Sequence, residues 1–225
     1  YLAGYTTSTS GIAFGGYQNI LEGNDDAFLV KFNNAGQRLW ATYYGGTGYD
    51  EAYSLDINVA GEIYLSGGTS STDFPLYNLS GAYNQSTNGG EIDAFLIKLS
   101  PIGLPIWATY YGGSYNDVGY KLPIILDSDG NLFMASMTGS IDFPLQNLSG
   151  AFNQSFWSGG SEAFIVKFSS SGELLWSTYF GGSNEENIFS VSIDTLGSLY
   201  ISGGTNSIDF PVKNLVGAYN QAQFA

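Results

Sequence analysis

The sequence predicts an all-β protein built from an internal repeat, and two observations predict it. A strand-like Asp/Glu-Ala-Phe segment followed by a Trp-containing segment occurs three times, and its tryptophans Trp40, Trp107 and Trp176 are 67 and 69 residues apart. No window shows sustained helical periodicity, and β-branched and aromatic residues dominate the repeated segments. A fixed period of this length indicates supersecondary units that stack on one another.

Two further motifs keep the same period. Asp-Phe-Pro begins at residues 73, 142 and 209, and Gly-Ala-Tyr/Phe-Asn-Gln begins at residues 81, 150 and 217. The first copy differs, because Ser10-Gly11-Ile12 stands where the later copies have Asp-Phe-Pro. Proline restricts the backbone and phenylalanine can fill the space between two sheets, so we interpret Asp-Phe-Pro as a structural motif.

Each full period predicts four short strands separated by turn residues. In the second copy we expect these strands at 52–58, 62–69, 93–99 and 105–111. Several of them alternate apolar with small or polar side chains, as strands with one face against a neighbour do. A long loop over 70–92 joins the second strand to the third.

A four-stranded sheet of this size cannot bury both of its faces alone. Repetition around an axis lets each sheet pack on the next, which is the architecture of a β-propeller with four-stranded antiparallel blades. We interpret the Trp that recurs at one position per repeat as a packing residue between blades, with stacking on a ligand as the alternative. The run Asp127-Ser128-Asp129-Gly130 looks like the turn between the two inner strands of a blade, so the blade begins near Ala52.

This phase divides the chain into thirteen strands. We expect residues 1–225 to form one propeller domain, in which 1–46 is a partial blade, 51–113 and 117–182 are whole blades, and 187–225 is a partial blade. A closed propeller needs four to eight blades. With only about three to four blades, the chain is expected to be a fragment of a larger propeller, or to complete its ring with another copy.

The composition argues against several classes of function. The formal net charge is −14 with only six Lys and Arg, which disfavours nucleic acids and anionic membrane surfaces as partners. No run of 18 apolar residues exists, so we expect no direct membrane insertion. The chain has neither histidine nor cysteine, which removes the usual catalytic bases, nucleophiles and zinc ligands. We therefore expect no enzymatic activity.

The repeated motifs resemble those of the bacterial β-propeller repeat family called SBBP. The resemblance rests on Asp-Ala-Phe-Leu-Val-Lys-Phe, on Trp-Ala-Thr-Tyr-Tyr-Gly-Gly with the acidic residues after it, and on Ser-Thr-Asp-Phe-Pro, over nearly the whole chain. It implies a propeller within a large secreted or cell-surface protein, of a kind frequent in Bacteroidota, and it implies no catalytic residues. The inserted Asn-Leu-Ser-Gly-Ala-Tyr/Phe-Asn-Gln loops depart from the family pattern.

Acidic residues follow each Gly-Gly pair, and Asp50, Asp117 and Glu186 are equivalent in the three copies. A ring of carboxylates near the propeller axis could hold Ca²⁺, which prefers oxygen ligands. The alternative, which we favour, is that each carboxylate accepts backbone N–H bonds in its own turn. The chain is otherwise expected to need no cofactor. Asp127 to Asn131 lacks the spacing of a calcium loop and predicts a β-turn.

The long loops carry an aromatic residue next to an asparagine, a pair that suits a sugar-binding edge. The candidate ligand-binding residues are Tyr83, Asn84, Phe152, Asn153, Tyr219 and Asn220. Packing within the loops is the alternative interpretation, and the one we favour.

These observations favour a non-enzymatic module. Regular repeats with variable long loops and without a catalytic constellation predict a structural scaffold or an adhesion and protein-interaction domain. Together with the resemblance, they predict a secreted, extracellular protein of a bacterial cell surface. Its expected partners are other domains or subunits of a surface assembly, with polysaccharide as a further candidate. The alternative is a carbohydrate-binding or carbohydrate-active propeller that uses the face with the long loops.

Overall fold

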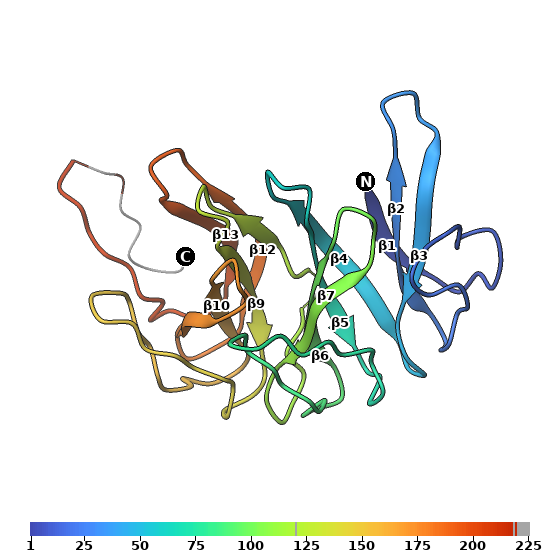
Figure 1. Cartoon of the computed structure of the whole chain (residues 1–225). Helices are drawn as coiled ribbons and strands as arrows, with labels where there is room; N and C mark the ends of the chain where they lie inside the picture. The colour runs from blue at the N-terminus through green and yellow to red at the C-terminus, as the bar shows by residue number, and fades with distance from the viewer. Residues whose placement is uncertain (120, 218, 220–225) are drawn as a thin grey trace.

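A computed structural model describes residues 1–119, 121–217 and 219, and this part of the chain is all-β (Figure 1). Its strands are β1 Leu2–Thr6, β2 Asp26–Phe32, β3 Arg38–Tyr44, β4 Asp50–Ile57, β5 Ile63–Thr69, β6 Asp93–Leu99, β7 Pro105–Tyr111, β8 Ile124–Leu126, β9 Leu132–Thr138, β10 Glu162–Phe168, β11 Leu174–Phe180, β12 Glu186–Ile193 and β13 Leu199–Thr205. No helix in the described residues has the length and apolar character to cross a membrane.

The strands form four antiparallel sheets in which neighbours in space are neighbours in sequence. The sheets are β1-β2-β3, β4-β5-β6-β7, β8-β9-β10-β11 and β12-β13, and we refer to each sheet as a blade. The predicted number of strands and their grouping into three, four, four and two are confirmed. The assignment of all residues to a single domain stays a prediction.

The blades follow one another from the blue to the red end of the chain (Figure 1). The first strands of the second and third blades, β4 and β8, lie side by side. Polar side chains of β4 accept hydrogen bonds from the backbone of β8. The amide of Ile124 donates to Ser54 Oγ at 3.2 Å, and the amide of Leu126 donates to Asp56 Oδ2 at 2.8 Å. The described blades therefore turn about a common inner side, and none of their sheets closes into a barrel.

Tight turns join the first two strands of each later blade. The amides of Gly61, Gly130 and Gly197 donate to the carbonyls of Asn58, Asp127 and Asp194 at 2.9, 3.0 and 3.0 Å. These glycines have φ values of 78°, 78° and 83°, which disfavour any residue with a Cβ. The β-turn predicted after Asp127 is confirmed.

The repeated tryptophan packs between blades, as predicted. Trp107 is 1% exposed, and its ring lies 5.6 Å from Phe168 of the next blade, centroid to centroid. Its indole N–H donates to the carbonyl of Tyr83 at 2.8 Å. Gly172, in the turn between β10 and β11, lies so close that a Cβ there would be 3.2 Å from Trp107 Cδ2. One tryptophan thus fixes a loop of its own blade and a turn of the next.

The Asp-Phe-Pro motif also joins blades, which confirms its structural interpretation. Phe74 is 3% exposed and lies 4.8 Å from Phe95 in its own blade and 5.3 Å from Tyr44 in the preceding blade. Phe143 repeats this arrangement. The carboxylate of Asp73 accepts hydrogen bonds from the backbone amide and the hydroxyl of Thr47 at 2.9 and 3.0 Å. It therefore holds the connection from β3 of the first blade to β4 of the second.

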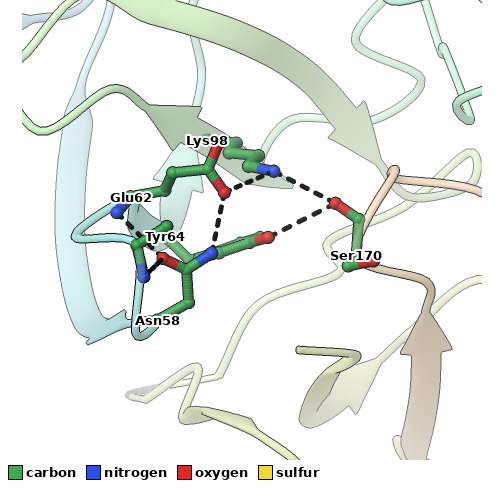
Figure 2. A network of polar contacts seen from close by, with 6 residues as sticks. Asn58, Glu62, Tyr64, Lys98 and Ser170 are labelled. Carbon is green, nitrogen blue, oxygen red and sulfur yellow. Dashed lines mark hydrogen bonds and ion pairs between the residues drawn. The ribbon is translucent and has the colours of Figure 1, made fainter. Parts of the chain in front are cut away.

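A lysine near the C-terminal end of β6, the third strand of its blade, makes another contact between blades (Figure 2). Lys98 Nζ lies 2.8 Å from Glu62 Oε2 and donates to the carbonyl of Ser170, in the next blade, at 3.1 Å. The ammonium group also lies 5.4 Å from the centre of the Tyr64 ring. The bond to Ser170 has an equivalent one blade earlier, where Lys31 Nζ donates to the carbonyl of Pro101 at 3.0 Å.

We expect Lys98→Met to lower the free energy of unfolding by about 1–3 kcal/mol. Methionine keeps the apolar stem of the side chain, but Glu62 and the carbonyl of Ser170 lose their common donor. Chemical denaturation followed by tryptophan fluorescence measures the change. The matched control is Lys167→Met, because Lys167 pairs with Asp127 of its own blade at 3.4 Å. Equal losses in the two variants would contradict a role of Lys98 in joining blades.

Candidate functional site

The long loops and the Gly-Gly turns meet at one end of the blades, which we call the loop face. Pairs of acidic residues recur there at a spacing of 24 residues, one at the start of a third strand and one near the start of the next blade. The pairs are Asp26 and Asp50, Asp93 and Asp117, and Glu162 and Glu186. All six side chains are almost fully buried.

The second member of each pair is held by two hydroxyls and a backbone amide. Asp50 accepts bonds from Thr69 Oγ1 at 2.5 Å, from Ser71 Oγ at 2.6 Å and from the amide of Gly46 at 2.8 Å. Asp117 and Glu186 have the corresponding partners in their own blades. These partners are Thr138, Ser140 and Gly113 for Asp117, and Thr205, Ser207 and Gly182 for Glu186. Since the glycine ends one blade and the hydroxyls belong to the next, each carboxylate fastens two blades together.

The first member of each pair closes the long loop of its own blade. Asp93 accepts bonds from the amides of Gly89 and Gly90 at 2.9 and 3.3 Å, and from Gln85 Nε2 at 3.0 Å. The other end of the Gln85 amide accepts a bond from the amide of Gly112 at 3.1 Å. Gln18 and Gln154 make the equivalent bridges. The glutamine therefore links the long loop, the third strand and the Gly-Gly turn.

Burial raises the pKa of these carboxyl groups. It raises the pKa of Asp50 and Asp117 to about 6 and that of Asp93 to about 7. The negative charge of Asp117 raises the pKa of Asp93 further, whereas the hydrogen bonds lower it. On the loop surface the direction is opposite, because the backbone bond from Thr47 lowers the pKa of Asp73.

We expect the protein to be more stable near pH 5 than near pH 8. A carboxyl whose pKa is higher in the folded than in the unfolded state binds extra protons on folding, so its contribution is complete below about pH 4 and is lost as the pH rises through 6 to 7. Asp73 acts oppositely and loses its contribution only in stronger acid. Denaturation curves at pH 5.0, 6.5 and 8.0 should show a decrease on the order of 5 kcal/mol.

The variant Asp93→Asn tests which groups cause this dependence. It removes the carboxyl with the pKa of about 7, and we expect a flatter pH profile. A stability that stays constant or increases from pH 5 to pH 8 would show that these carboxyls do not bind protons on folding.

The structure places the three predicted metal ligands Asp50, Asp117 and Glu186 in three different blade interfaces. Among the described residues, no group of three or more acidic side chains is arranged to hold a metal ion. Each carboxylate accepts one backbone N–H bond in its own turn, as in the alternative that we favoured from the sequence, but its two hydroxyl partners in the next blade were not predicted. A calcium site at these residues stays a prediction.

Two shallow grooves recur on the loop face, between the long loop of one blade and the Asp-Phe-Pro loop of the next. We call them the loop-face grooves, and their volumes are about 560 and 530 Å³. The first is lined by Tyr17, Gln18, Asn19, Thr47, Asp73 and Pro75, and the second by Tyr83, Asn84, Gln85, Ser114, Asp142 and Pro144. An aromatic ring, two amides, a hydroxyl and a carboxylate thus repeat from one groove to the next, a combination that can hydrogen-bond polar ligands.

The predicted ligand-binding residues do not meet in one pocket. Tyr83 and Asn84 line the second groove, whereas Phe152 lies in the next blade and is 49% exposed. The amides of Asn84 and Asn153 donate to carbonyls of their own loops, for example to Ala82 and Ala151, each at 2.9 Å.

The third predicted pair lies at the end of the chain. Tyr219 is exposed, and Asn220 lies outside the described residues. Sugar binding stays a prediction, and the two described asparagines pack in their loops as the alternative interpretation has it.

Sequence reasoning did not single out the first acid of each pair or the bridging glutamines. The signal for the acids was present, because both members of a pair are Asp in two copies and both are Glu in the third. The signal for the glutamine was weaker, since Gln18 precedes Asn19 whereas Gln85 and Gln154 follow an asparagine. Only the hydrogen bonds show that the three glutamines are equivalent.

Comparison with known proteins adds one relative. No family model matches the chain. The chain is 27% identical over 222 aligned residues to an uncharacterized WD repeat-containing protein of Acanthamoeba polyphaga mimivirus, in a match that covers 83% of this chain and 15% of that protein. The chain therefore spans about 15% of the length of this relative. Its all-β blades and this likeness together indicate a repeat propeller with several blades.

Proposed function

We propose that the chain is a non-enzymatic propeller module, and that its loop face is an interaction or adhesion surface. The observation that supports this proposal is the separation of two sets of polar groups on that face. Buried carboxylates and glutamines hold the long loops and the Gly-Gly turns by hydrogen bonds, whereas Ser86, Thr87 and Ser114 on the same face are exposed. The first set makes the blades rigid, and the second set is free to differ from blade to blade.

The charge of the loop face supports a protein partner. Seven carboxylates that are not buried lie in the connections on this face or in the first two residues of strands that start there, against two of the six basic residues, Lys121 and Lys213. These carboxylates are Glu22, Glu51, Asp73, Glu91, Asp142, Glu185 and Asp209. Such a surface attracts positively charged partners and speeds their association.

The family resemblance supports a cellular setting for this function. The motifs similar to SBBP repeats suggest that the module belongs to a large secreted bacterial cell-surface protein. In that setting its partners are other domains or subunits of the surface assembly. The WD repeat in the name of the viral relative supports a role in protein interaction, and the small share of that protein covered by the match fits a module within a long chain.

A second candidate function is carbohydrate binding by the loop-face grooves. Its specific support is the recurrence of Tyr17 and Tyr83 with neighbouring amides in two grooves of similar volume. A regular spacing of equivalent grooves suits a polymer with repeating units, because each unit adds to the avidity.

One pair of variants tests both candidates. Ser86→Trp places a large side chain in the second groove at an exposed position. The control Ala35→Trp places the same side chain in the exposed turn between β2 and β3, at the end of the first blade away from the loop face. We expect Ser86→Trp alone to abolish binding, measured against the extracellular proteins of the source cells by photo-cross-linking and against glycans on an array. Protein cross-links that both variants retain would contradict the proposed use of the loop face.

A further inference from the structure

The two loop-face grooves repeat one chemical composition at two successive junctions between blades. The second groove is walled by the rings of Tyr83 and Pro144 and contains the carboxylate of Asp142. The corresponding groups in the first groove are Tyr17, Pro75 and Asp73. None of the described residues that line either groove is a lysine or an arginine. Each groove therefore combines apolar walls with negative charge.

The carboxylate of Asp142 is exposed and fixed in one orientation. Its Oδ1 accepts hydrogen bonds from the amide and the hydroxyl of Ser114 at 2.9 and 3.0 Å. The bond from the backbone of Ser114 lowers the pKa of Asp142, so the group is ionised at neutral pH. A Cβ on Gly113 would be 2.5 Å from the same oxygen, so the carboxylate lies directly against the Gly-Gly turn. No other residue in the described part of the chain donates to Oδ2, and this oxygen can accept a bond from a ligand.

The apolar walls of the grooves are held by buried tyrosines. The hydroxyl of Tyr111 donates to the carbonyl of Pro144 at 2.6 Å, and the ring of Tyr83 lies 5.2 Å from that of Tyr111. In the first groove the hydroxyl of Tyr44 donates to the carbonyl of Pro75 at 2.7 Å. The walls are thus formed before a ligand arrives, which lowers the entropic cost of binding.

The amide groups in the second groove already have partners within the protein. Gln85 donates to Asp93 at 3.0 Å and accepts from the amide of Gly112 at 3.1 Å. The side chain of Asn84 donates to two carbonyls of its own loop. A neutral sugar would need such amides for its hydroxyls. The free carboxylate oxygen and the ring walls instead suit a cation on an apolar stem, as in lysine and arginine.

Buried carboxyl groups beneath the grooves add to this preference. Gly112 lines the second groove, and a Cβ there would be 2.6 Å from Asp93 Cγ and 2.7 Å from Asp117 Oδ2. The first groove has a second exposed carboxylate, that of Glu22. Charges of one sign around a cleft focus the electrostatic potential there and raise the local concentration of the opposite ion.

We propose that each loop-face groove binds a lysine or arginine side chain of a protein partner. The apolar stem lies against the tyrosine and proline rings, and the cationic group bonds to Asp73 in the first groove and to Asp142 in the second. This proposal rests on the proposed interaction function of the loop face, and it narrows the partner to a polypeptide that exposes basic side chains.

The test uses the full chain and a fluorescent synthetic peptide of alternating lysine and glycine. We expect saturable binding by fluorescence anisotropy at low ionic strength, weakened by added salt. The same peptide with acetylated lysines should bind at least tenfold more weakly, because acetylation removes the charge but keeps the stem. Equal binding of the two peptides would overturn the proposal. Binding of neutral glycans without binding of the lysine peptide would assign the grooves to carbohydrate and overturn it too.

Variants of the chain separate the grooves from the general attraction of an acidic protein. In Asp73→Asn/Asp142→Asn the side-chain oxygen can still accept the bonds from Thr47 and Ser114, but the charge is lost. We expect at least tenfold weaker binding of the lysine peptide. The control Asp129→Asn removes an exposed charge in the turn between β8 and β9, away from the loop face, and should change binding less than twofold. Equal weakening in the two variants would mean that net charge alone attracts the peptide, and would overturn the proposal.

Carbodiimide coupling of the lysine peptide to the unaltered chain locates the contact even if the double variant fails to fold. Mass spectrometry should find the peptide joined to Asp73 and Asp142 far more often than to Asp129, and equal coupling at the three would contradict the proposal.

The proposed function can survive the failure of this proposal. If Ser86→Trp abolishes protein cross-links and Asp73→Asn/Asp142→Asn retains them, the loop face remains the interaction surface and the binding of basic side chains is overturned. We expect both variants to lose the cross-links.

Discussion

Trp107→Ala is expected to lower the free energy of unfolding by about 3–5 kcal/mol, the range for removing a fully buried aromatic side chain. Trp107 is 1% exposed and touches two blades, so the substitution leaves a cavity in the interface between them. It also leaves the carbonyl of Tyr83 without the indole N–H that now donates to it at 2.8 Å. Denaturation by urea, followed by circular dichroism, measures the loss.

Trp176→Ala is the matched control. Trp176 has the same place in its repeat and donates to the carbonyl of Phe152 at 2.9 Å. Its ring is only half-buried, because in the described residues the following blade consists of β12 and β13 and has no strand equivalent to β10, which carries Phe168 against Trp107. We expect a clearly smaller loss of stability. Similar losses for the two tryptophans would mean that contact with the next blade adds little to the stability of the protein.

Gly112→Ala is expected to destabilise the protein by about 3 kcal/mol, at the upper end of the effects of overpacking. Gly112 lies between the carboxylates of one pair, and a Cβ there would be 2.6 Å from Asp93 Cγ and 2.7 Å from Asp117 Oδ2. Both carboxylates are buried and fixed by hydrogen bonds, so neither can move without losing partners. Thermal and urea unfolding at pH 7 measure the effect.

The control for this substitution is Gly204→Ala. A Cβ on Gly204 would meet nothing nearer than Phe189 Cε2 at 3.9 Å. We expect a change within about 0.5 kcal/mol, because an alanine also restricts the unfolded chain. If Gly112→Ala were tolerated as well as Gly204→Ala, the two carboxylates could not be packed against this turn.

Much of the fold follows from the repeat alone. The recurrence of Trp, of Asp-Phe-Pro and of the Asp/Glu-Ala-Phe strand predicted thirteen strands and their grouping, because each strand type appears at least three times with the same neighbours. The interfaces also followed, since Trp107 and Phe74 each have counterparts in two further blades and are too large and apolar to face water. These predictions needed no knowledge of distances.

The candidate site was harder to predict because it depends on hydrogen bonds between residues far apart in sequence. Gln85 meets Gly112, which lies 27 residues away, and Asp50 meets Ser71, which lies 21 residues away. A sequence shows that such polar residues recur, but not which of them face each other. For this reason Asp50, Asp117 and Glu186 could be interpreted either as metal ligands or as turn residues.

The buried carboxylates of the loop face join neighbouring blades by hydrogen bonds, and the pKa of Asp117 tests this role. A titration of the Asp117 side-chain carboxyl by carbon-13 NMR, with and without Ca²⁺, measures it. We predict a pKa of about 6 and a titration curve that millimolar Ca²⁺ leaves unchanged. A carboxyl that titrates like an exposed aspartate, or whose pKa falls when Ca²⁺ is added, would contradict the fastening role and favour a metal site.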